Sequence, residues 1–252
     1  MAKLKWGILG AGNIARAFAR GVVHSQTGEL VAVGSRTQES ADKFGEEFGL
    51  TRRHASYEAL LADPEVEAVY IATPHPFHAE WAIKAAEAKK HILCEKPIAL
   101  NQAHAMAMIE AAQRNDVFLM EAFMYRCHPQ IAKLVELLRA NAIGKVRMIQ
   151  ATFGFSAGFS PEGRLFKNAL GGGGILDVGC YATSMARLVA GVAMGKDFAE
   201  PTEVHGVGRI GETGVDEWTT AVAKFPGDII AQVTTSVRMS PENVVRIFGS
   251  EG

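Results

Sequence analysis

Two glycines near the start of the chain are spaced to hold a phosphate. Gly10-Ala11-Gly12-Asn13-Ile14-Ala15 has the pattern GxGxxA and directly follows an apolar run. In a loop between a strand and a helix, the first glycine permits a tight turn, the second lets the main chain approach a pyrophosphate, and the alanine lets the helix pack closely. We therefore predict a dinucleotide site at Gly10, Gly12, Asn13 and Ile14, in preference to a purely structural turn.

The residues after the next predicted strand indicate which dinucleotide binds. Gly34-Ser35-Arg36-Thr37 stands where an Asp or Glu would hold the ribose hydroxyls of NAD, and no acid is present. Ser35 can hydrogen-bond a 2′-phosphate, and Arg36 can pair with it and stack on adenine. The sequence favours NADP, with NAD still possible, because one arginine does not exclude dual use and could also be a solvated loop charge.

A third motif places a lysine where parallel sheets bind their ligands. Glu95-Lys96-Pro97 follows the predicted strand 91–94, and ligands of such sheets lie over the carboxyl ends of the strands. Lys96 would point beside a nicotinamide ring, where it could hold a substrate hydroxyl and relay its proton as hydride moves. The simpler alternative is an exposed lysine before a loop proline.

Strands and helices must alternate to position these motifs, and the first half of the chain has that pattern. Predicted strands at 5–9, 30–34, 68–72, 91–94 and 117–120 alternate with predicted helices at 14–23, 38–48, 57–61, 76–89 and 101–113. Ser56 and Asn101 are expected to cap two of these helices. Such alternation predicts a parallel, doubly wound sheet with helices on both faces, over residues 1–122.

The second half has a different pattern. A predicted helix at 129–140 and a strand at 146–155 precede a glycine-rich segment that ends at Gly174, and a helix at 177–189 follows. Three alternating strands, 204–210, 217–225 and 229–237, come last, with a turn at 226–228. Residues 123–252 therefore predict a second α/β domain with an open, largely antiparallel sheet, and the whole chain an α/β protein.

Composition excludes several classes of protein. The 252 residues carry 26 Lys+Arg and 27 Asp+Glu, and 48% of them are hydrophobic, as in ordinary folded domains. No basic cluster indicates nucleic acid or an anionic membrane surface. The longest apolar stretch, 182–195, is interrupted by Arg187 and is shorter than the ~18 residues of a membrane span. We expect neither nucleic acid nor a membrane as a partner.

Cysteine and histidine usage indicates no metal or disulfide. Cys94, Cys127 and Cys180 are an odd number without CxxC spacing, which fits reduced thiols. No signal-peptide pattern opens the chain, so we expect a cytoplasmic protein. His75 and His78 lie on a proline-containing loop and no second pair has ligand spacing, so no metal site is expected.

Together these motifs resemble the glucose-fructose oxidoreductase/inositol dehydrogenase family, Gfo/Idh/MocA, over nearly the whole chain. The resemblance rests on GxGxxA, Ala72-Thr73-Pro74 with His78, Glu95-Lys96-Pro97, and Gly172-Gly173-Gly174 with Asp177. It implies a Rossmann domain, a cis bond before Pro97 and a catalytic Lys96. It also implies NAD(P)-linked oxidation or reduction of sugars and related alcohols. Its remaining cofactor contacts would be Thr73, Pro74, His78, Glu95 and Arg126.

The resemblance further implies a C-terminal α/β domain for substrate binding and oligomerisation, whose open sheet often forms the dimer interface. We therefore expect a homodimer or a higher homo-oligomer. Members of the family are usually longer than 252 residues, and this chain stops just after an apparent strand. The C-terminal domain is therefore expected to be shortened, with an exposed edge strand.

Two positions depart from the family pattern. Many members have histidine where this chain has Tyr181, four residues after Asp177. The tyrosine version, like the stretch 120–126, is similar to the branch that contains dihydrodiol dehydrogenase and NADP-dependent D-xylose dehydrogenase. His75 replaces a common asparagine, which leaves the fit near the nicotinamide open.

Tyr181 could donate a proton to a carbonyl oxygen, with Lys96 nearby lowering its pKa. Asp177, on the same face of an α-helix, could hydrogen-bond a substrate hydroxyl. A core tyrosine and a helix-capping aspartate are the alternatives.

The leading hypothesis is an NADP-dependent oxidoreductase that moves a hydride between nicotinamide and a sugar, polyol or cyclic, dihydrodiol-like alcohol. Lys96 and Tyr181 would handle the proton and Asp177 would orient the substrate. The alternative is a non-catalytic NAD(P)-binding sensor or regulator of the same fold. Such a protein could dispense with the lysine, so the presence of Lys96 and Tyr181 favours catalysis.

Overall fold

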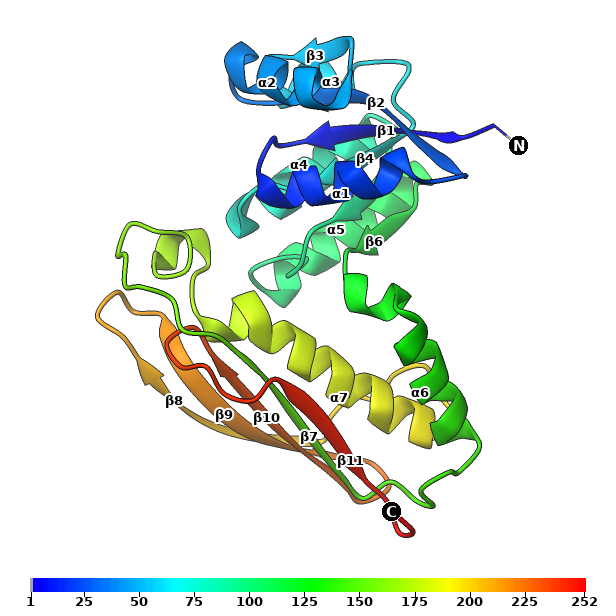
Figure 1. Ribbon diagram of the computed structural model, residues 1–252, viewed down its shortest axis with the longest axis vertical. Coiled ribbons are helices and arrows are strands. Elements are labelled where there is room, and N and C mark those ends of the chain that lie inside the picture. The colour runs from blue at the N-terminus through cyan, green and yellow to red at the C-terminus, as the bar shows by residue number, and fades with distance from the viewer. Residues whose placement is uncertain (1) are drawn as a thin grey trace. The chain divides into compact units, whose positions relative to one another are not determined.

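The computed structural model describes residues 2–252, which form two compact units that meet in sequence between Ala122 and Phe123. Each unit has one sheet and its own hydrophobic core. Figure 1 shows the sheet and the helices of each unit.

The sheet of the first unit is parallel throughout, with the strand order β3-β2-β1-β4-β5-β6. Its strands are β1 (Leu4–Leu9), β2 (Gly28–Gly34), β3 (Arg52–His54), β4 (Ala68–Ile71), β5 (His91–Cys94) and β6 (Leu119–Glu121). The order reverses between β1 and β4, which is the switch point of a Rossmann domain. The predicted doubly wound sheet is therefore confirmed. Strand β3 was not predicted, because three polar residues carry no hydrophobic pattern.

Helices cover both faces of this sheet. They are α1 (Asn13–Val23), α2 (Gln38–Phe48), α3 (Tyr57–Leu61), α4 (His78–Glu87) and α5 (Gln102–Asn115). As predicted, the side chains of Ser56 and Asn101 cap α3 and α5 by accepting main-chain hydrogen bonds. The helix predicted from residue 76 instead starts with a 3-10 turn, η1 (His75–Phe77), and α4 begins at His78. Pro76 has no N–H to donate, so it fits the first turn.

Neighbouring residues of β1 supply opposite faces of the core. Ile8 packs with Val33 and Phe44 on one face, whereas Leu9 packs with Ile71 and other residues on the other face. Ile8 and Leu9 are both fully buried. A strand buried on both faces has a continuous apolar run in its sequence, and the apolar run at residues 5–9 predicted this strand for that reason.

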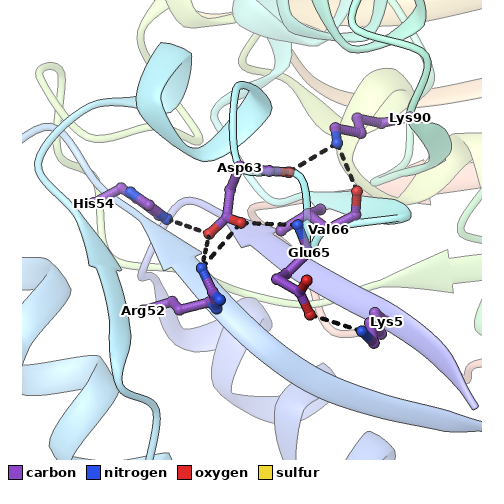
Figure 2. A network of polar contacts seen from close by, with 7 residues as sticks. All are labelled: Lys5, Arg52, His54, Asp63, Glu65, Val66 and Lys90. Atoms are coloured by element: carbon purple, nitrogen blue, oxygen red, sulfur yellow. Dashed lines mark hydrogen bonds and ion pairs between the residues drawn. The ribbon is translucent and has the colours of Figure 1, made fainter.

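A buried aspartate organises the loop after α3 (Figure 2). Asp63 accepts hydrogen bonds from Arg52, from the His54 ring and from the main-chain N–H of Glu65, at 2.9 to 3.3 Å. The Lys90 ammonium donates to the carbonyl oxygens of Asp63 and Val66 at 2.8 and 2.6 Å, and burial lowers the pKa of Lys90. This network links β3, the loop and the start of β5.

The sheet of the second unit has the order β11-β7-β10-β9-β8. Its strands are β7 (Met148–Gly154), β8 (Glu203–Ile210), β9 (Asp216–Phe225), β10 (Ile229–Ser236) and β11 (Val244–Phe248). All neighbours pair antiparallel except β7 and β10, which are parallel. Gly227 and Asp228 form the β9–β10 turn, both with positive φ. The predicted open, largely antiparallel sheet is confirmed.

Helices cover one face of this sheet (Figure 1). They are α6 (Pro129–Arg139) and α7 (Cys180–Ala193), with short turns η2 (Met124–Cys127), η3 (Asn168–Leu170) and η4 (Ile175–Gly179). Leu188 and Val189 of α7 pack on Ile149 and Ala231 of the sheet. The segment Asn168–Ala193 is long and apolar enough to cross a membrane, but 67% of its most apolar window is buried inside the protein. Packing in the core therefore accounts for its hydropathy.

Candidate active site

The predicted cofactor residues of the first unit follow the carboxyl ends of its strands. Gly10 follows β1, Ser35 follows β2, Thr73 comes after β4, and Glu95 with Lys96 follows β5. The strands are parallel, so these ends lie at one edge of the sheet, where open α/β sheets bind their ligands.

The glycine loop is shaped to hold a phosphate. Gly10 has a φ of +105°, and a Cβ there would lie 3.1 Å from the carbonyl oxygen of Ala72. A Cβ at Gly12 would meet no atom within 4 Å, and Gly12, Asn13 and Ile14 are exposed. No side chain caps the N-terminus of α1, so its N–H groups and the positive end of its dipole are available to an anion. These groups fit the pyrophosphate of a dinucleotide.

The hydroxyl of Thr73 supports the same site. Its Oγ1 is buried and has no hydrogen-bond partner in the described part of the chain. Buried hydroxyls without a partner are rare, and this one is able to hydrogen-bond a group that covers the strand end. Pro74 beside it is exposed, so both predicted contact residues fit a cofactor that covers this strand end.

Ser35 and Arg36 lie in different surroundings. Ser35 is buried, and its main-chain N–H donates to the carbonyl oxygen of His54 on β3 at 3.0 Å. Arg36 is exposed. Burial raises the pKa of Tyr57 on α3, and the positive charge of Arg36 opposes that shift. The hydrogen bond to β3 thus fixes the main chain of Ser35, whereas the Arg36 side chain is exposed near Tyr57 of α3.

His78 does not lie where the sequence predicted it. Its side chain is fully buried, so it offers no surface for direct contact with a cofactor. Its two ring nitrogens lie 2.9 Å from the carbonyl oxygens of Pro97 and Thr73. Burial lowers the pKa of His78, and the hydrogen bonds to Pro97 and Thr73 oppose that shift. His78 therefore joins the two segments that carry Thr73 and Lys96.

The main chain around Lys96 is held from two neighbouring strands. The hydroxyl of Tyr70, on β4, donates to Oε1 of Glu95, and Oε2 of Glu95 accepts from the N–H of Lys96 at 3.2 Å. Glu121, at the end of β6, accepts from the N–H of Ile98 at 2.7 Å. The Lys96–Pro97 peptide is cis, as the resemblance implied. Sequence reasoning missed the roles of both residues: Tyr70 lies in no recognisable motif, and Glu121 lies in the stretch 120–126, where the sequence pattern gave it no contact.

Asp177 lies in a π-helical turn and not in an α-helix. The turn spans Ile175–Gly179 and runs directly into α7. The α-helical face that the sequence assigned to Asp177 and Tyr181 therefore does not hold. The residues before the two segments are Gly174 and Gly179, and Asp177 caps neither of them. Instead, the buried Asp177 carboxylate accepts a hydrogen bond from Arg164 Nη1 at 2.8 Å. π-Helical turns are frequent at functional sites.

Tyr181 lies among other aromatic rings of the second unit. The centroids of Phe123, Tyr125 and Phe153 lie 5.4, 5.9 and 5.4 Å from that of Tyr181. The Tyr125 hydroxyl lies 2.8 Å from Ser184 Oγ. Tyr181 is half-buried, and these three neighbouring rings hold its ring in place.

Arg126 stacks on an aromatic ring of the same unit, with its guanidinium carbon 4.6 Å from the centroid of Phe198. Its role toward a cofactor stays a prediction. Cys94, Cys127 and Cys180 are free thiols. Across residues 2–252, no three His, Cys, Asp or Glu side chains are grouped as metal ligands would be.

Known families match both units. The family described as "Oxidoreductase family, NAD-binding Rossmann fold" matches residues 4–123, and "GFO/IDH/MocA C-terminal domain" matches residues 131–252. A trans-1,2-dihydrobenzene-1,2-diol dehydrogenase from Danio rerio is 36% identical over 251 residues, which are 99% of this chain and 73% of that protein.

Solved structures show the same fold. An aldose-aldose oxidoreductase from Caulobacter crescentus, complexed with glycerol, has a TM-score of 0.88 and 29% identity, over 98% of this chain and 74% of that one. KijD10, a 3-ketoreductase from Actinomadura kijaniata in complex with NADP and TDP-benzene, has a TM-score of 0.85 and 28% identity over the same shares. Two further structures of KijD10 carry a lysine-to-alanine and a tyrosine-to-phenylalanine substitution.

Both family matches, the sequence identity to dehydrogenases and the structural neighbours agree on the family of this chain. The chain therefore belongs to the Gfo/Idh/MocA family of oxidoreductases and is an NAD(P)-dependent dehydrogenase that acts on CH–OH groups.

Proposed function

We propose that this protein is an NADP-dependent oxidoreductase that transfers a hydride between nicotinamide and a sugar, polyol or cyclic alcohol. The observation that carries the proposal is the edge of the first sheet. There the uncapped N-terminus of α1, the orphaned Thr73 hydroxyl and Lys96 all follow strand ends. The NADP-bound ketoreductase and the glycerol-bound aldose-aldose oxidoreductase support it by analogy.

Preference for NADP over NAD rests on the end of β2. No acid follows this strand, and Ser35 and Arg36 stand there instead. The exposed Arg36 guanidinium can pair with a 2′-phosphate in a two-pronged contact, whereas a 2′-hydroxyl gives it a weaker partner. NADP in the ketoreductase structure is consistent with this preference.

In the proposed mechanism, bound nicotinamide supplies the hydride acceptor or donor. In the oxidising direction, the C–H bond of the alcohol breaks with its electron pair leaving as hydride, while the O–H bond gives up its proton and a carbonyl forms. Tyr181, as the phenolate, would take this proton, and Lys96 would hold the substrate oxygen. In the reducing direction, Tyr181 returns a proton to the carbonyl oxygen. Asp177 accepts a hydrogen bond from a neighbouring substrate hydroxyl.

The residues of the second unit favour a substrate with one apolar and one hydroxylated side. Phe123, Tyr125 and Phe153 surround Tyr181 with ring edges and faces, which suit the C–H faces of sugars or of cyclic diols. The Arg164–Asp177 pair supplies polar groups. Both dihydrodiols and sugars have this character.

We also propose that two copies pair through the open sheet of the second unit. Strand β8 is exposed along its whole length. Val207 of β8, Val222 of β9 and Ile230 of β10 lie on the sheet face opposite the core residues Ala223 and Ala231 and are 79%, 47% and 44% exposed. Exposed apolar groups clustered on one sheet face are typical of interaction surfaces.

We further propose that the protein works in the cytoplasm. Its three cysteines are free thiols, as is usual for proteins of a reducing compartment.

The test is an assay of the purified protein with NADP and NAD against aldoses, inositols and dihydrodiols. Activity with NADP on at least one of these is expected, and Lys96→Ala should bind NADP with little change while losing turnover by about a hundredfold or more. Lys133→Ala, which removes an exposed lysine of α6, is the matched control. Bound NADP without turnover on any substrate, or full turnover in Lys96→Ala, would contradict the proposal.

A further inference from the structure

Asp216, the first residue of β9, holds the segment that leads to Asp177. Its Oδ2 accepts a hydrogen bond from the main-chain N–H of Ile175 at 2.9 Å and another from the Thr219 hydroxyl at 3.3 Å. Gly173 approaches so closely, at a φ of +108°, that a Cβ there would clash with Oδ1 of Asp216. The carboxylate thus lies directly against the end of the glycine-rich loop.

The neighbouring strand holds the other side of the same peptide unit. Thr235 of β10 is buried, and its hydroxyl donates to the carbonyl oxygen of Gly174 at 2.9 Å. The N–H of Ile175 and the carbonyl of Gly174 belong to one peptide. Asp216 and Thr235 therefore fix that peptide from two adjacent strands.

The fixed peptide is the point at which the π-helical turn begins. Residue 175 opens the turn Ile175–Gly179, which contains Asp177 and continues into α7 with Tyr181. A carboxylate at the start of a helical segment also interacts favourably with its dipole. Burial raises the pKa of Asp216, because it disfavours the charged carboxylate. Keeping a carboxyl group at this place therefore costs folding free energy.

We propose that Asp216 is a positioning residue for catalysis, which sets the start of the π-helical turn and through it the placement of Asp177 and Tyr181. The proposal rests on the proposed function, because it assumes that those two side chains act on the substrate. The side-chain hydrogen bonds described for Asp216 come from the Ile175 N–H and the Thr219 hydroxyl. Its effect passes through the main chain.

The first experiment compares Asp216→Ala, Asp216→Asn and Thr235→Val. Misplacement of catalytic groups lowers the turnover step, so Asp216→Ala should lower kcat by about tenfold or more while the NADP Kd changes by less than about twofold. Asparagine keeps an oxygen that can accept from Ile175 N–H, so Asp216→Asn should recover part of the kcat. Thr235→Val keeps the side-chain shape but loses the donor, and it should also lower kcat.

A matched control separates positioning from loss of stability. Asp63→Asn replaces a buried aspartate that, like Asp216, accepts hydrogen bonds from a main-chain N–H and from a side chain, but lies in the first unit and away from the motifs (Figure 2). It should lower Tm with kcat within about twofold of wild type. If Asp216→Ala and Thr235→Val keep the wild-type kcat, or if Asp63→Asn loses as much kcat as they do, the proposal is wrong.

Hydrogen exchange provides a readout that does not depend on turnover. In Asp216→Ala, or in Asp216→Asn if the alanine variant does not fold, the amides of residues 174–181 should exchange faster by about tenfold. The amides of β1 and β4 should be unchanged. If the wild type has no dehydrogenase activity but this local change occurs, the proposed function fails and the anchoring role stands. Unchanged exchange at 174–181 refutes the anchoring role whatever the activity.

Discussion

Arg164 donates from Nη1 to Oδ1 of Asp177 at 2.8 Å, which pairs a half-exposed guanidinium with a carboxylate that is almost wholly buried. Arg164 comes from the loop before the glycine-rich segment, and Asp177 comes from the π-helical turn after it. A buried carboxylate that loses its cation becomes costly. The pair therefore fixes the side chain that is proposed to hold a substrate hydroxyl.

Arg164→Gln should raise KM for the alcohol more than it lowers kcat, because Asp177 would lose the partner that orients it. Steady-state kinetics at saturating NADP measure how much of the loss is in KM and how much is in kcat. Arg164→Lys keeps the charge but not the planar fork, so it should recover part of the lost affinity. Equal KM values in wild type and Arg164→Gln would show that the pair has no part in substrate binding.

Gly12→Val should lower NADP affinity by about tenfold or more without unfolding the protein. A Cβ at Gly12 meets no protein atom within 4 Å, so the side chain would occupy only the space proposed for the pyrophosphate. Isothermal titration gives the Kd, and thermal unfolding gives Tm. The control is Gly21→Ala, also without neighbours within 4 Å but in the interior of α1, which should leave the Kd unchanged and stabilise by up to ~1 kcal/mol.

Arg36→Glu should reverse the cofactor preference. A carboxylate repels the 2′-phosphate of NADP and can accept hydrogen bonds from the ribose hydroxyls of NAD. We expect kcat/KM for NADP to fall by about tenfold or more and kcat/KM for NAD to rise. Arg36→Ala should lose NADP activity without the gain for NAD, which separates removal of the arginine from introduction of the acid. An unchanged ratio would place the 2′-phosphate elsewhere.

Lys96→Met and Tyr181→Phe should be strongly non-additive. If both side chains serve one proton transfer, removing the second after the first costs little more, as for other groups that act as a unit. The measurement is kcat/KM for both single variants and the double variant. A coupling energy of about 1 kcal/mol or more supports the shared role, whereas additive losses would assign the residues to separate steps.

Asp63→Asn should destabilise the first unit more at neutral pH than in acid. Burial of Asp63 favours the neutral acid, but hydrogen bonds from Glu65 N–H and His54 and the charge of Arg52 outweigh it, so the pKa of Asp63 lies below its ordinary 3.8. A lowered pKa in the folded state stabilises the fold above about pH 4 and is lost as the pH falls through the folded value.

Urea unfolding at pH 7 and near pH 3 measures this dependence. The expected loss is about 1–3 kcal/mol at pH 7, with a smaller difference from wild type in acid. The same difference at both pH values would mean that ionisation of Asp63 does not contribute.

The sequence determined the features that depend on local patterns. Buried parallel strands give continuous apolar runs, so β1, β2, β4 and β5 could be recognised. The glycine pattern predicted a tight turn at Gly10, which has a positive φ. Ser56 and Asn101 predicted the starts of two helices, because short polar side chains accept hydrogen bonds from the free N–H groups there. Lys96 could be placed at a strand end because it comes shortly after the apolar run 91–94.

Only the tertiary structure decided which distant side chains meet. The partners Tyr70 and Glu95, Arg164 and Asp177, and Asp216 and Ile175 are 25, 13 and 41 residues apart, and no local periodicity encodes such pairs. Burial of His78 and the parallel pairing of β7 with β10 likewise depend on how whole elements pack. Local patterns fix the hydrogen bonds within an element, whereas contacts between elements depend on the whole chain finding one packed arrangement.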